Sequence, residues 1–189
     1  MCRGDSESKF LGTQIDNHLN WLNYIEQIIF KLHATCFSIR LLVHISSMIT
    51  LKSMYYAYFN SIIKYGIIFW SNSFNIRKRF TSQKQVIRIM AGAQHRTLHR
   101  SLFEQLEILP VPCQYILSLI NFIINNWENF QTNSSIHNIN TRNKHQLHRP
   151  YAKLPCFQKS TFYAGIKISN NLPLSGQYSR MTRQNLKQS

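Results

Sequence analysis

The 189-residue sequence predicts a mainly α-helical protein: a helix bundle that follows one short strand and precedes a basic, poorly ordered C-terminal segment. Three observations carry this prediction. Glycine (6) and proline (5) are scarce, which favours helices over a turn-rich β-fold. Hydrophobic residues recur at three- and four-residue steps over a long central stretch, and the composition becomes polar and basic near residue 130.

The composition divides the chain into three predicted regions. Residues 1–15 contain the strand, which covers Ser8–Ile15, and residues 16–130 form the helical domain. Residues 131–189 form a basic segment, partly disordered, that contains no Asp or Glu. Within it only Phe157–Leu172 has the pattern of a folded element, either a helix or a pair of strands. Residues 175–189 are expected to be a solvated tail.

Two helices are predicted first in the central region. The first follows Asp16 or Asn17 as a cap, and its apolar stripe consists of Trp21, Ile25, Ile28, Leu32, Cys36 and Ile39. The second opens at Thr50, and its predicted buried face consists of Leu51, Met54, Tyr55, Tyr58, Phe59 and Ile62.

Three further helices complete the predicted bundle. One covers Ile76–Ala91 and ends at Gly92, a favourable C-cap residue. A short helix follows at Ser101–Leu106. Pro112 then opens a long helix through Asn129, because proline is tolerated in a first turn. The apolar residues of this last helix are Tyr115, Ile116, Leu119, Ile120, Ile123 and Trp127.

The charge balance predicts an anionic partner. The chain has 22 Lys+Arg against 7 Asp+Glu, a formal net charge of +15. Phosphate backbones are the common partner of so large a surplus, and the alternative is a basic surface without a ligand. No membrane is expected, because the longest apolar stretch, Tyr115–Ile124, is shorter than the roughly 20 residues of a span. The N-terminus shows no apolar signal-peptide core.

The cysteines and histidines predict neither a metal site nor a cofactor. Cys2, Cys36, Cys113 and Cys156 are isolated from one another, which is typical of reduced, buried thiols. His95 and His99 could share a helix face, as could His145 and His148, but no carboxylate or cysteine accompanies either pair.

The stretch from Arg77 to Arg100 is the strongest candidate binding element. Arg77, Lys84 and Arg88 are spaced seven and four residues apart, so they share one helix face, and we expect Phe80, Ile87 and Met90 on the opposite, buried side. No acid interleaves to form ion pairs, which favours phosphate contacts over a merely solvated face. The next candidates in this stretch are Lys78, Arg79, Arg96 and Arg100.

A second basic region, Arg142–Lys159, extends the predicted footprint through Arg142 and Lys144. It also holds Tyr151 and Phe157, aromatic side chains of the kind on which bases stack. A flexible basic tail is the alternative interpretation. Nothing here has the geometry of a base-reading motif, so we expect low sequence specificity.

No catalytic residue is predicted. Polymerases and nucleases cluster carboxylates around two metal ions, whereas the acids here are scattered: Asp5, Glu7, Asp16, Glu26, Glu104, Glu107 and Glu128. The sequence also lacks a glycine-rich phosphate loop and a nucleophile elbow. A small hydrolase or nuclease is the competing hypothesis, and no sequence feature promotes it.

Several short motifs follow one another along the chain in an order that is typical of a known protein family. They are Phe10-Leu11-Gly12 with Asp16, Leu19 and Trp21; Thr50-Leu51, Tyr55-Tyr56, Ser61, Tyr65-Gly66 and Trp70; Gln83-Lys84, Ile87-Arg88-Ile89 and Gly92; Leu106, Leu109-Pro110 and Pro112; His137 and Asn140–Asn143; and Gly165–Ile168 with Leu172-Pro173. In this order and spacing the chain resembles the C-terminal part of a non-LTR, LINE-type (jockey-like) retrotransposon reverse transcriptase.

The resemblance covers about residues 10–173 and implies a primer-grip strand, a helical thumb that holds the template–primer duplex, and a basic C-terminal segment. Ser82 stands where the family usually has Leu, Ile139 stands where it has Tyr, and the likeness stops after Pro173. The catalytic aspartates of such enzymes belong to a palm domain that these motifs do not include. The resemblance therefore implies no polymerase active site in this segment.

The sequence thus predicts a thumb-like module that is not an enzyme by itself. Its expected partner is an RNA–DNA hybrid or another duplex, bound through phosphates, together with the palm domain of a parent polymerase. The alternative is an inactive, decayed copy that folds only against that palm. An intracellular location is expected, in the nucleus if the ancestral role persists.

Overall fold

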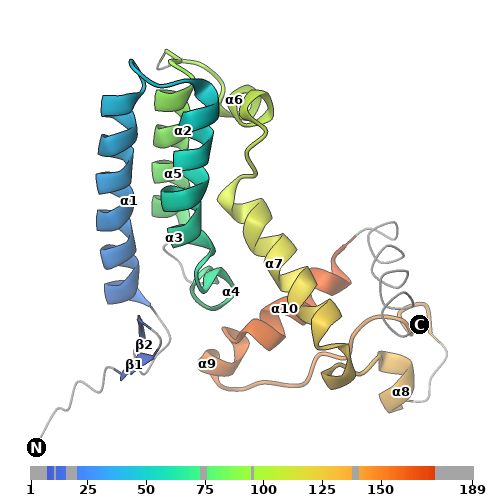
Figure 1. The fold of residues 1–189 in the computed structure, drawn as a ribbon. Coiled ribbons are helices and arrows are strands. Elements are labelled where there is room, and N and C mark those ends of the chain that lie inside the picture. Colours follow the sequence, from blue (N-terminus) through green and yellow to red (C-terminus); the bar gives the residue numbers. More distant parts are fainter. Residues whose placement is uncertain are drawn as a thin grey trace, which may run out of the picture. The chain divides into compact units, whose positions relative to one another are not determined.

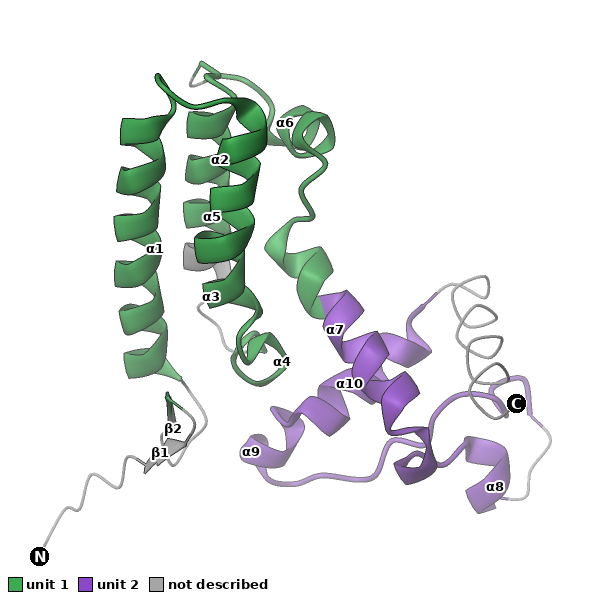
Figure 2. Cartoon of the chain, viewed as in Figure 1, with its two compact units in different colours: residues 1–115 green, residues 116–189 purple. Residues whose placement is uncertain are grey.

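The computed structural model is mainly α-helical, as the sequence predicts (Figure 1). It describes residues 8–10, 12–15, 21–72, 76–94, 96–137 and 141–172, and at positions 8–10, 14–15 and 76–79 it describes the backbone alone. Contacts divide the chain between Tyr115 and Ile116 into unit 1 (residues 1–115) and unit 2 (residues 116–189) (Figure 2). The composition changes nearer residue 130, and the three predicted regions remain a prediction.

The predicted single strand Ser8–Ile15 is instead a small hairpin. β1 (Ser8–Phe10) and β2 (Thr13–Ile15) pair antiparallel, with Phe10 opposite Thr13. Gly12 has a φ of +76°, a left-handed conformation that glycine adopts without the steric penalty of a Cβ. The chain therefore reverses at this point, and each strand supplies the partner that a lone strand would lack.

The first helix, α1 (Leu22–Leu42), confirms the predicted apolar stripe. Its core-facing side packs against α5, η1 and α3. Trp21 precedes it with a φ of +59° and no side-chain cap, while the predicted caps Asp16 and Asn17 lie outside the described residues. All members of the predicted stripe are buried: Trp21, Ile25, Ile28, Leu32, Cys36 and Ile39.

A nearly continuous helical segment follows. It consists of α2 (Met48–Met54), the π-helical turn η1 (Tyr55–Asn60) and α3 (Ser61–Lys64), and the short α4 (Ile67–Trp70) comes next. The Ser47 hydroxyl accepts a hydrogen bond from the Thr50 N–H at 3.3 Å, so Ser47 is the N-cap. The predicted start at Thr50 is therefore corrected: Thr50 lies inside the first turn.

The π-helical turn decides which side chains of this segment are buried. The buried row follows strict four-residue steps: Leu51, Tyr55, Phe59 and Ile63. In an α-helix each step of four drifts by about 40°. A π-helical turn holds more residues than an α-helical turn, so a step of four residues there drifts around the axis in the opposite direction. This compensates the α-helical drift and keeps the row facing the core. Tyr58, which the sequence predicted to be buried, is consequently 61% exposed.

Two helices then lead to the site. α5 (Ile76–Met90) ends before Gly92, as predicted, and Gly92 has a φ of +59°. The Ala93 N–H donates to the Arg88 carbonyl at 3.2 Å across this turn, which closes the helix end. α6 (His99–Leu106) begins before the predicted start at Ser101, so that His99 becomes a helix residue.

The side-chain amide of Gln83 joins three segments of unit 1 and is 0% exposed. Its Nε2 donates to the Tyr55 hydroxyl (2.8 Å) and to the Leu109 carbonyl (3.0 Å). Its Oε1 accepts from the Val111 N–H at 2.8 Å. A carbonyl can only accept and an N–H can only donate, so the orientation of the amide is fixed. These bonds hold η1 and the start of α7 (Val111–Asn125) against α5.

Unit 2 contains the rest of α7, the 3₁₀ turn η2 (Trp127–Asn129), α8 (Asn133–His137), α9 (Pro155–Gln158) and α10 (Thr161–Asn170). Its core is a cluster of Ile123, Phe130, Leu147 and Ile166. The Asn170 side chain binds the Leu147 backbone twice, accepting from the N–H at 2.9 Å and donating to the carbonyl at 2.8 Å. Gly165 lets α10 approach α7, because a Cβ there would lie 3.3 Å from the Ile123 side chain.

Three expectations about this half of the chain have different outcomes. The helix predicted through Asn129 ends at Asn125, and a 3₁₀ turn follows it. α10 confirms the helical alternative for Phe157–Leu172. Residues 173–189, including the predicted tail, lie outside the described residues.

Among the described residues no single helix is long and apolar enough to cross a membrane. Taken together, α6 and α7 reach the required length and composition, but the pair is bent by 57°. Leu102, Phe103 and Leu106 of α6 are buried, as are Leu119 and Ile123 of α7.

The Gln83 amide predicts a large effect of its removal. Replacing Gln83 with Leu leaves the buried Val111 N–H without its acceptor, so we expect the free energy of unfolding to fall by about 2–4 kcal/mol. The matched control is Gln85→Leu on the exposed side of the same helix, which should change stability by less than about 0.5 kcal/mol. Urea unfolding followed by circular dichroism measures both, and equal effects of the two substitutions would contradict the role given to Gln83.

Candidate nucleic-acid interface

A hollow of about 510 Å³ lies on unit 1, between the end of α1 and the later turns of α5. Three cations line it: Arg40 from α1, and Lys84 and Arg88 from α5. We call this hollow the cation groove. Among the described residues no acidic side chain lines it, and the remaining lining residues are Thr81, Gln85, Ile89, Ala93 and His99.

The packing of α5 on α1 places these cations. Val86, Ile87 and Met90 are buried on the inner side of α5, so Lys84 and Arg88, four residues apart, share an adjoining edge of the helix. Arg40 directly follows the buried Ile39 and is exposed in the last turn of α1. A cation at a helix C-terminus is stabilised by the helix dipole, which suits Arg40 to this position.

Lys84 lies half-buried against the neighbouring turn of its helix. Its ammonium nitrogen is 4.2 Å from the centroid of the Phe80 ring, a cation–π contact. The sequence predicted Phe80 on the side opposite Lys84, and this is wrong. Positions four apart share a helix face, and the Phe80 ring is held there by stacking on Phe103, with a centroid separation of 6.1 Å.

Arg88 is held by His99, the first residue of α6. Its Nη2 lies 3.1 Å from the His99 Nε2. A guanidinium can only donate, so the His99 Nε2 is the acceptor and this ring carries its proton on Nδ1. Arg88 Nε is also buried and has no hydrogen-bond partner among the described residues. The Arg88 guanidinium is therefore positioned by the fold and only partly open to solvent.

Cys36 lies beside the groove, on the buried side of α1. Burial raises the pKa of its thiol to about 11, and the positive charge of Arg40 opposes part of this rise. The Cys36 sulfur also lies 3.9 Å from the Ser82 carbonyl on α5. The thiol is thus a protonated contact between the two helices that carry the groove.

The other predicted cations of this stretch have different surroundings. The backbones of Arg77, Lys78 and Arg79 lie in α5, but their side chains are outside the described part of the structure. Arg96 is exposed in the connection between α5 and α6. Arg100 is exposed on α6 and forms an ion pair with Glu104 at 3.1 Å. An ion pair this exposed contributes about 0–1 kcal/mol, so Arg100 can exchange its partner.

The predicted extension through Arg142 and Lys144 lies in unit 2, in the stretch before the buried Leu147. Arg142 is exposed and Lys144 is half-buried. Another cation of unit 2 has an aromatic partner: the Arg149 guanidinium is 5.3 Å from the Tyr163 ring. The predicted stacking residues Tyr151 and Phe157 are exposed, at 87% and 43%.

The described residues contain no group of three or more His, Cys, Asp or Glu side chains that could hold a metal ion. The rings of His137 and His148 have centroids 5.1 Å apart. His95, of the predicted pair with His99, lies outside the described residues. His99 is instead the partner of Arg88, a role that its sequence spacing did not indicate.

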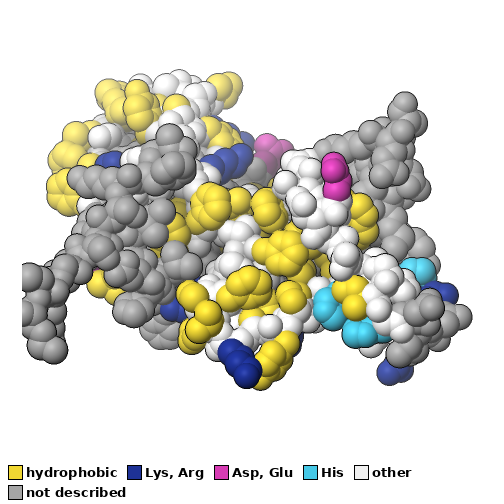
Figure 3. Space-filling model, turned by 90° about the horizontal axis from the view of Figure 1, so that it is seen from below, with side chains coloured by type: hydrophobic (Ala, Val, Ile, Leu, Met, Phe, Trp, Pro, Cys, Tyr) yellow, Lys and Arg dark blue, Asp and Glu magenta, His cyan; other side chains and the backbone are white. Residues whose placement is uncertain are grey.

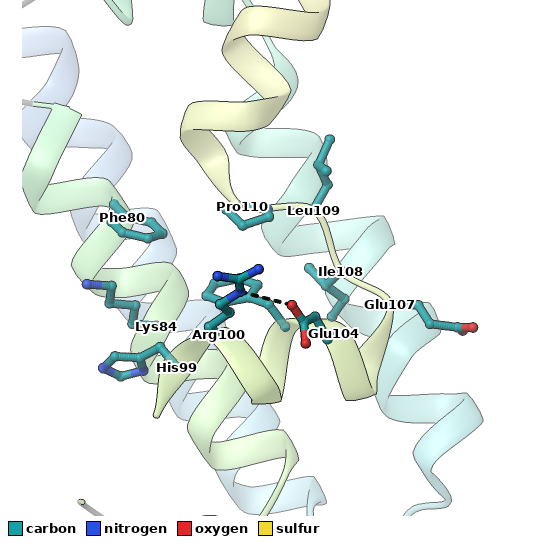
Figure 4. A pocket seen from close by; sticks show the side chains of 10 residues that line it. Phe80, Lys84, His99, Arg100, Glu104, Glu107, Ile108, Leu109 and Pro110 are labelled. Atoms are coloured by element: carbon teal, nitrogen blue, oxygen red, sulfur yellow. Dashed lines mark hydrogen bonds and ion pairs between the residues drawn. The ribbon is translucent and has the colours of Figure 1, made fainter. Parts of the chain in front are cut away.

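A second hollow, of about 590 Å³, adjoins the cation groove on unit 1 (Figure 4). We call it the apolar pocket. It shares Lys84 and His99 with the groove. Its apolar walls are Phe80, Phe103, Ile108, Leu109 and Pro110, and its rim carries Arg100, Glu104 and Glu107.

The described cysteines differ in solvent exposure, and this difference tests the packing of α1 on α5 beneath the groove. Cys113 and Cys156 are exposed, whereas Cys36 is buried. In a Cys2→Ser variant at pH 8, we expect Cys113 and Cys156 to react quickly with a disulfide reagent. Cys36 should react only when unit 1 unfolds. Its raised pKa keeps the thiolate scarce until the pH approaches 11. Absorbance of the released thiolate counts the reacting groups, and fast reaction of all three thiols in the folded chain would contradict this packing.

Comparison with known proteins provides no relative: no family model, no curated protein and no solved structure matches the chain significantly. The candidate interface therefore rests on its own residues and their geometry. That geometry combines a groove lined by cations with an adjoining apolar pocket.

Proposed function

We propose that the chain binds nucleic acid through its phosphate backbone, gripping a duplex such as an RNA–DNA hybrid with little sequence preference. The observation that carries this proposal is the cation groove, in which Arg40, Lys84 and Arg88 converge from two helices with no acid among the lining residues. Cations that neutralise phosphates release counterions, which is the main driving force of such binding.

The groove favours an extended phosphate chain over a neutral ligand. Lys84 supplies a mobile point charge, and the Arg88 guanidinium is held in place by His99. Thr81 and Gln85 add polar side chains along the same wall. Contacts of this kind orient a duplex but do not distinguish base sequences, so low specificity is expected.

The resemblance to a reverse-transcriptase thumb supports the same proposal. Lys84 and Arg88 belong to the motifs Gln83-Lys84 and Ile87-Arg88-Ile89 on which that resemblance rests. In this interpretation unit 1 contributes the helices of a thumb that holds a template–primer duplex, without a polymerase active site of its own. We therefore propose that the chain is a binding module and not an enzyme by itself. It would act in the nucleus if the ancestral role persists.

The proposal is tested by fluorescence anisotropy of labelled RNA–DNA hybrid, duplex DNA and single-stranded RNA over a salt series. We expect log affinity to fall linearly with log salt concentration and the hybrid to bind most tightly. In the variant Arg40→Glu/Lys84→Glu, binding should weaken and the salt slope should become shallower by about two, because two phosphate contacts are lost. Arg88 is left intact because its half-buried guanidinium also supports the fold.

The matched control is Lys31→Glu/Lys64→Glu, which changes the net charge equally at two exposed positions of unit 1 outside the groove. This control should retain most of the affinity. Equal losses in the two double variants would mean that only the overall charge attracts nucleic acid. Absence of binding by a soluble, helical chain would reject the proposal.

The alternative function, a segment that folds only against a palm domain, is favoured by a different observation. Phe30, Phe37 and Leu41 are 77%, 61% and 60% exposed on one face of α1. Ile45 and Ile49, which follow α1, are 80% and 79% exposed. Figure 3 shows that hydrophobic side chains are exposed elsewhere on the described residues as well. Exposed apolar surface of this kind is typical of an interaction site.

Under this alternative the isolated chain should self-associate and bind a hydrophobic dye strongly. Substituting Phe30, Phe37 and Leu41 with Gln should then restore a monomer and reduce dye fluorescence several-fold, because the apolar face of α1 is removed. Light scattering coupled to size-exclusion chromatography measures the mass. A wild-type chain that is monomeric and unfolds cooperatively would contradict the alternative.

A further inference from the structure

The cation groove and the apolar pocket differ in charge although they share Lys84 and His99. The groove has no acidic lining. At the rim of the pocket, by contrast, Glu104 neutralises Arg100 at 3.1 Å and Glu107 pairs with Lys52 at 3.3 Å. A ligand that covers both hollows must therefore carry its negative charge on one side and a flat or apolar group on the other.

We propose that the apolar pocket receives one unpaired nucleobase from the strand whose phosphates lie in the cation groove. This proposal rests on the proposed function and names its substrate more closely: a nucleic acid with an unpaired base. A nucleotide has the required polarity, because its phosphate is anionic and its base is uncharged with two flat π-faces. The charges at the rim of the pocket are paired, so a phosphate is attracted less to the pocket than to the cation groove.

The pocket has the size and walls that a base needs. Its volume of about 590 Å³ lies within the roughly 300–1,000 Å³ of small-molecule sites. Phe80 provides the aromatic surface, with the nearly buried Phe103 ring stacked on it, and Ile108 and Pro110 complete an apolar wall. Arg100 and Glu104 lie across the pocket from Phe80 in Figure 4, where they can donate to and accept from the edge of a base.

Lys84 couples the two hollows. Its ammonium now covers the Phe80 ring at 4.2 Å, an ordinary cation–π contact. A base stacked on an aromatic ring gains more than an exposed cation–π contact supplies, and the ammonium gains a phosphate when it leaves the ring. Exchange is therefore favourable: the base takes the ring face that Lys84 gives up, and Lys84 turns to the backbone of the same strand.

The test uses the full-length chain and three duplexes of one sequence. The first carries a single unpaired 2-aminopurine, the second carries an abasic residue in its place, and the third is fully paired. We expect the unpaired base to bind about 5- to 100-fold more tightly than the abasic duplex, with quenching of 2-aminopurine fluorescence. Equal affinity for these two duplexes would overturn the pocket while leaving phosphate binding intact. Absence of binding to all three would reject both proposals.

The variant Phe80→Leu separates the pocket from the groove, because it keeps an apolar side chain and removes the flat ring. It should lose the preference for the unpaired base and retain the affinity for the paired duplex within about twofold. The matched control is Phe37→Leu, the same substitution at an exposed position of α1, which should keep the preference. If Phe80→Leu still prefers the unpaired base, the pocket is not the base-binding site. The same conclusion follows if the chain quenches the free 2-aminopurine nucleoside as strongly as it quenches the duplex.

Discussion

The buried amide of Gln83 is the constraint on which the candidate interface depends. It accepts from the Val111 N–H and donates to the Leu109 carbonyl, at the start of α7, and it also donates to the Tyr55 hydroxyl. Burial raises the pKa of Tyr55, and the hydrogen bond from Gln83 partly opposes this rise. Once Gln83 points inward, its neighbour Lys84 is turned by about 100° around the helix and reaches the edge of α5. A buried polar group thus fixes the direction of an adjacent cation.

The apolar packing of α5 on α1 provides the second half of the same arrangement. α5 packs against α1, and this brings Arg40 into the groove with Lys84. The π-helical turn contributes from the other side, because it keeps Tyr55 aligned with the buried row and therefore within reach of Gln83. Local helix geometry, core packing and surface charge are linked through these few contacts.

Most of the helices could be predicted from sequence because their signals are local. The stripe along α1 and the glycine end of α5 depend on periodicity and on a single left-handed residue. The outward position of Tyr58 could not be predicted, because an α-helical period was assumed where the chain forms a π-turn. The sequence predicts one strand where the structure has a hairpin, because a single glycine, Gly12, is the only sequence signal of the turn.

Only part of the candidate site can be predicted from the sequence. Lys84 and Arg88 follow from spacing along one helix, and the structure places both in the groove. Arg40 and His99 were missed because they come from other helices, and only tertiary packing brings them to α5. Phe80 was assigned to the opposite face, although its four-residue distance from Lys84 was a usable signal. The apolar pocket depends on Ile108 and Pro110, whose positions no helical period indicates.

In the proposed complex, nucleic acid lies in the groove between α1 and α5, with the apolar pocket beside it. The most direct test of this arrangement is photo-crosslinking of an oligonucleotide that carries a photoreactive base at an unpaired position, followed by mass spectrometry of the modified peptides. The account predicts adducts on peptides that contain Phe80 or Lys84, and on the peptide that contains Arg40. Adducts confined to residues 141–189 would contradict it, because the binding surface would then lie in the basic C-terminal segment.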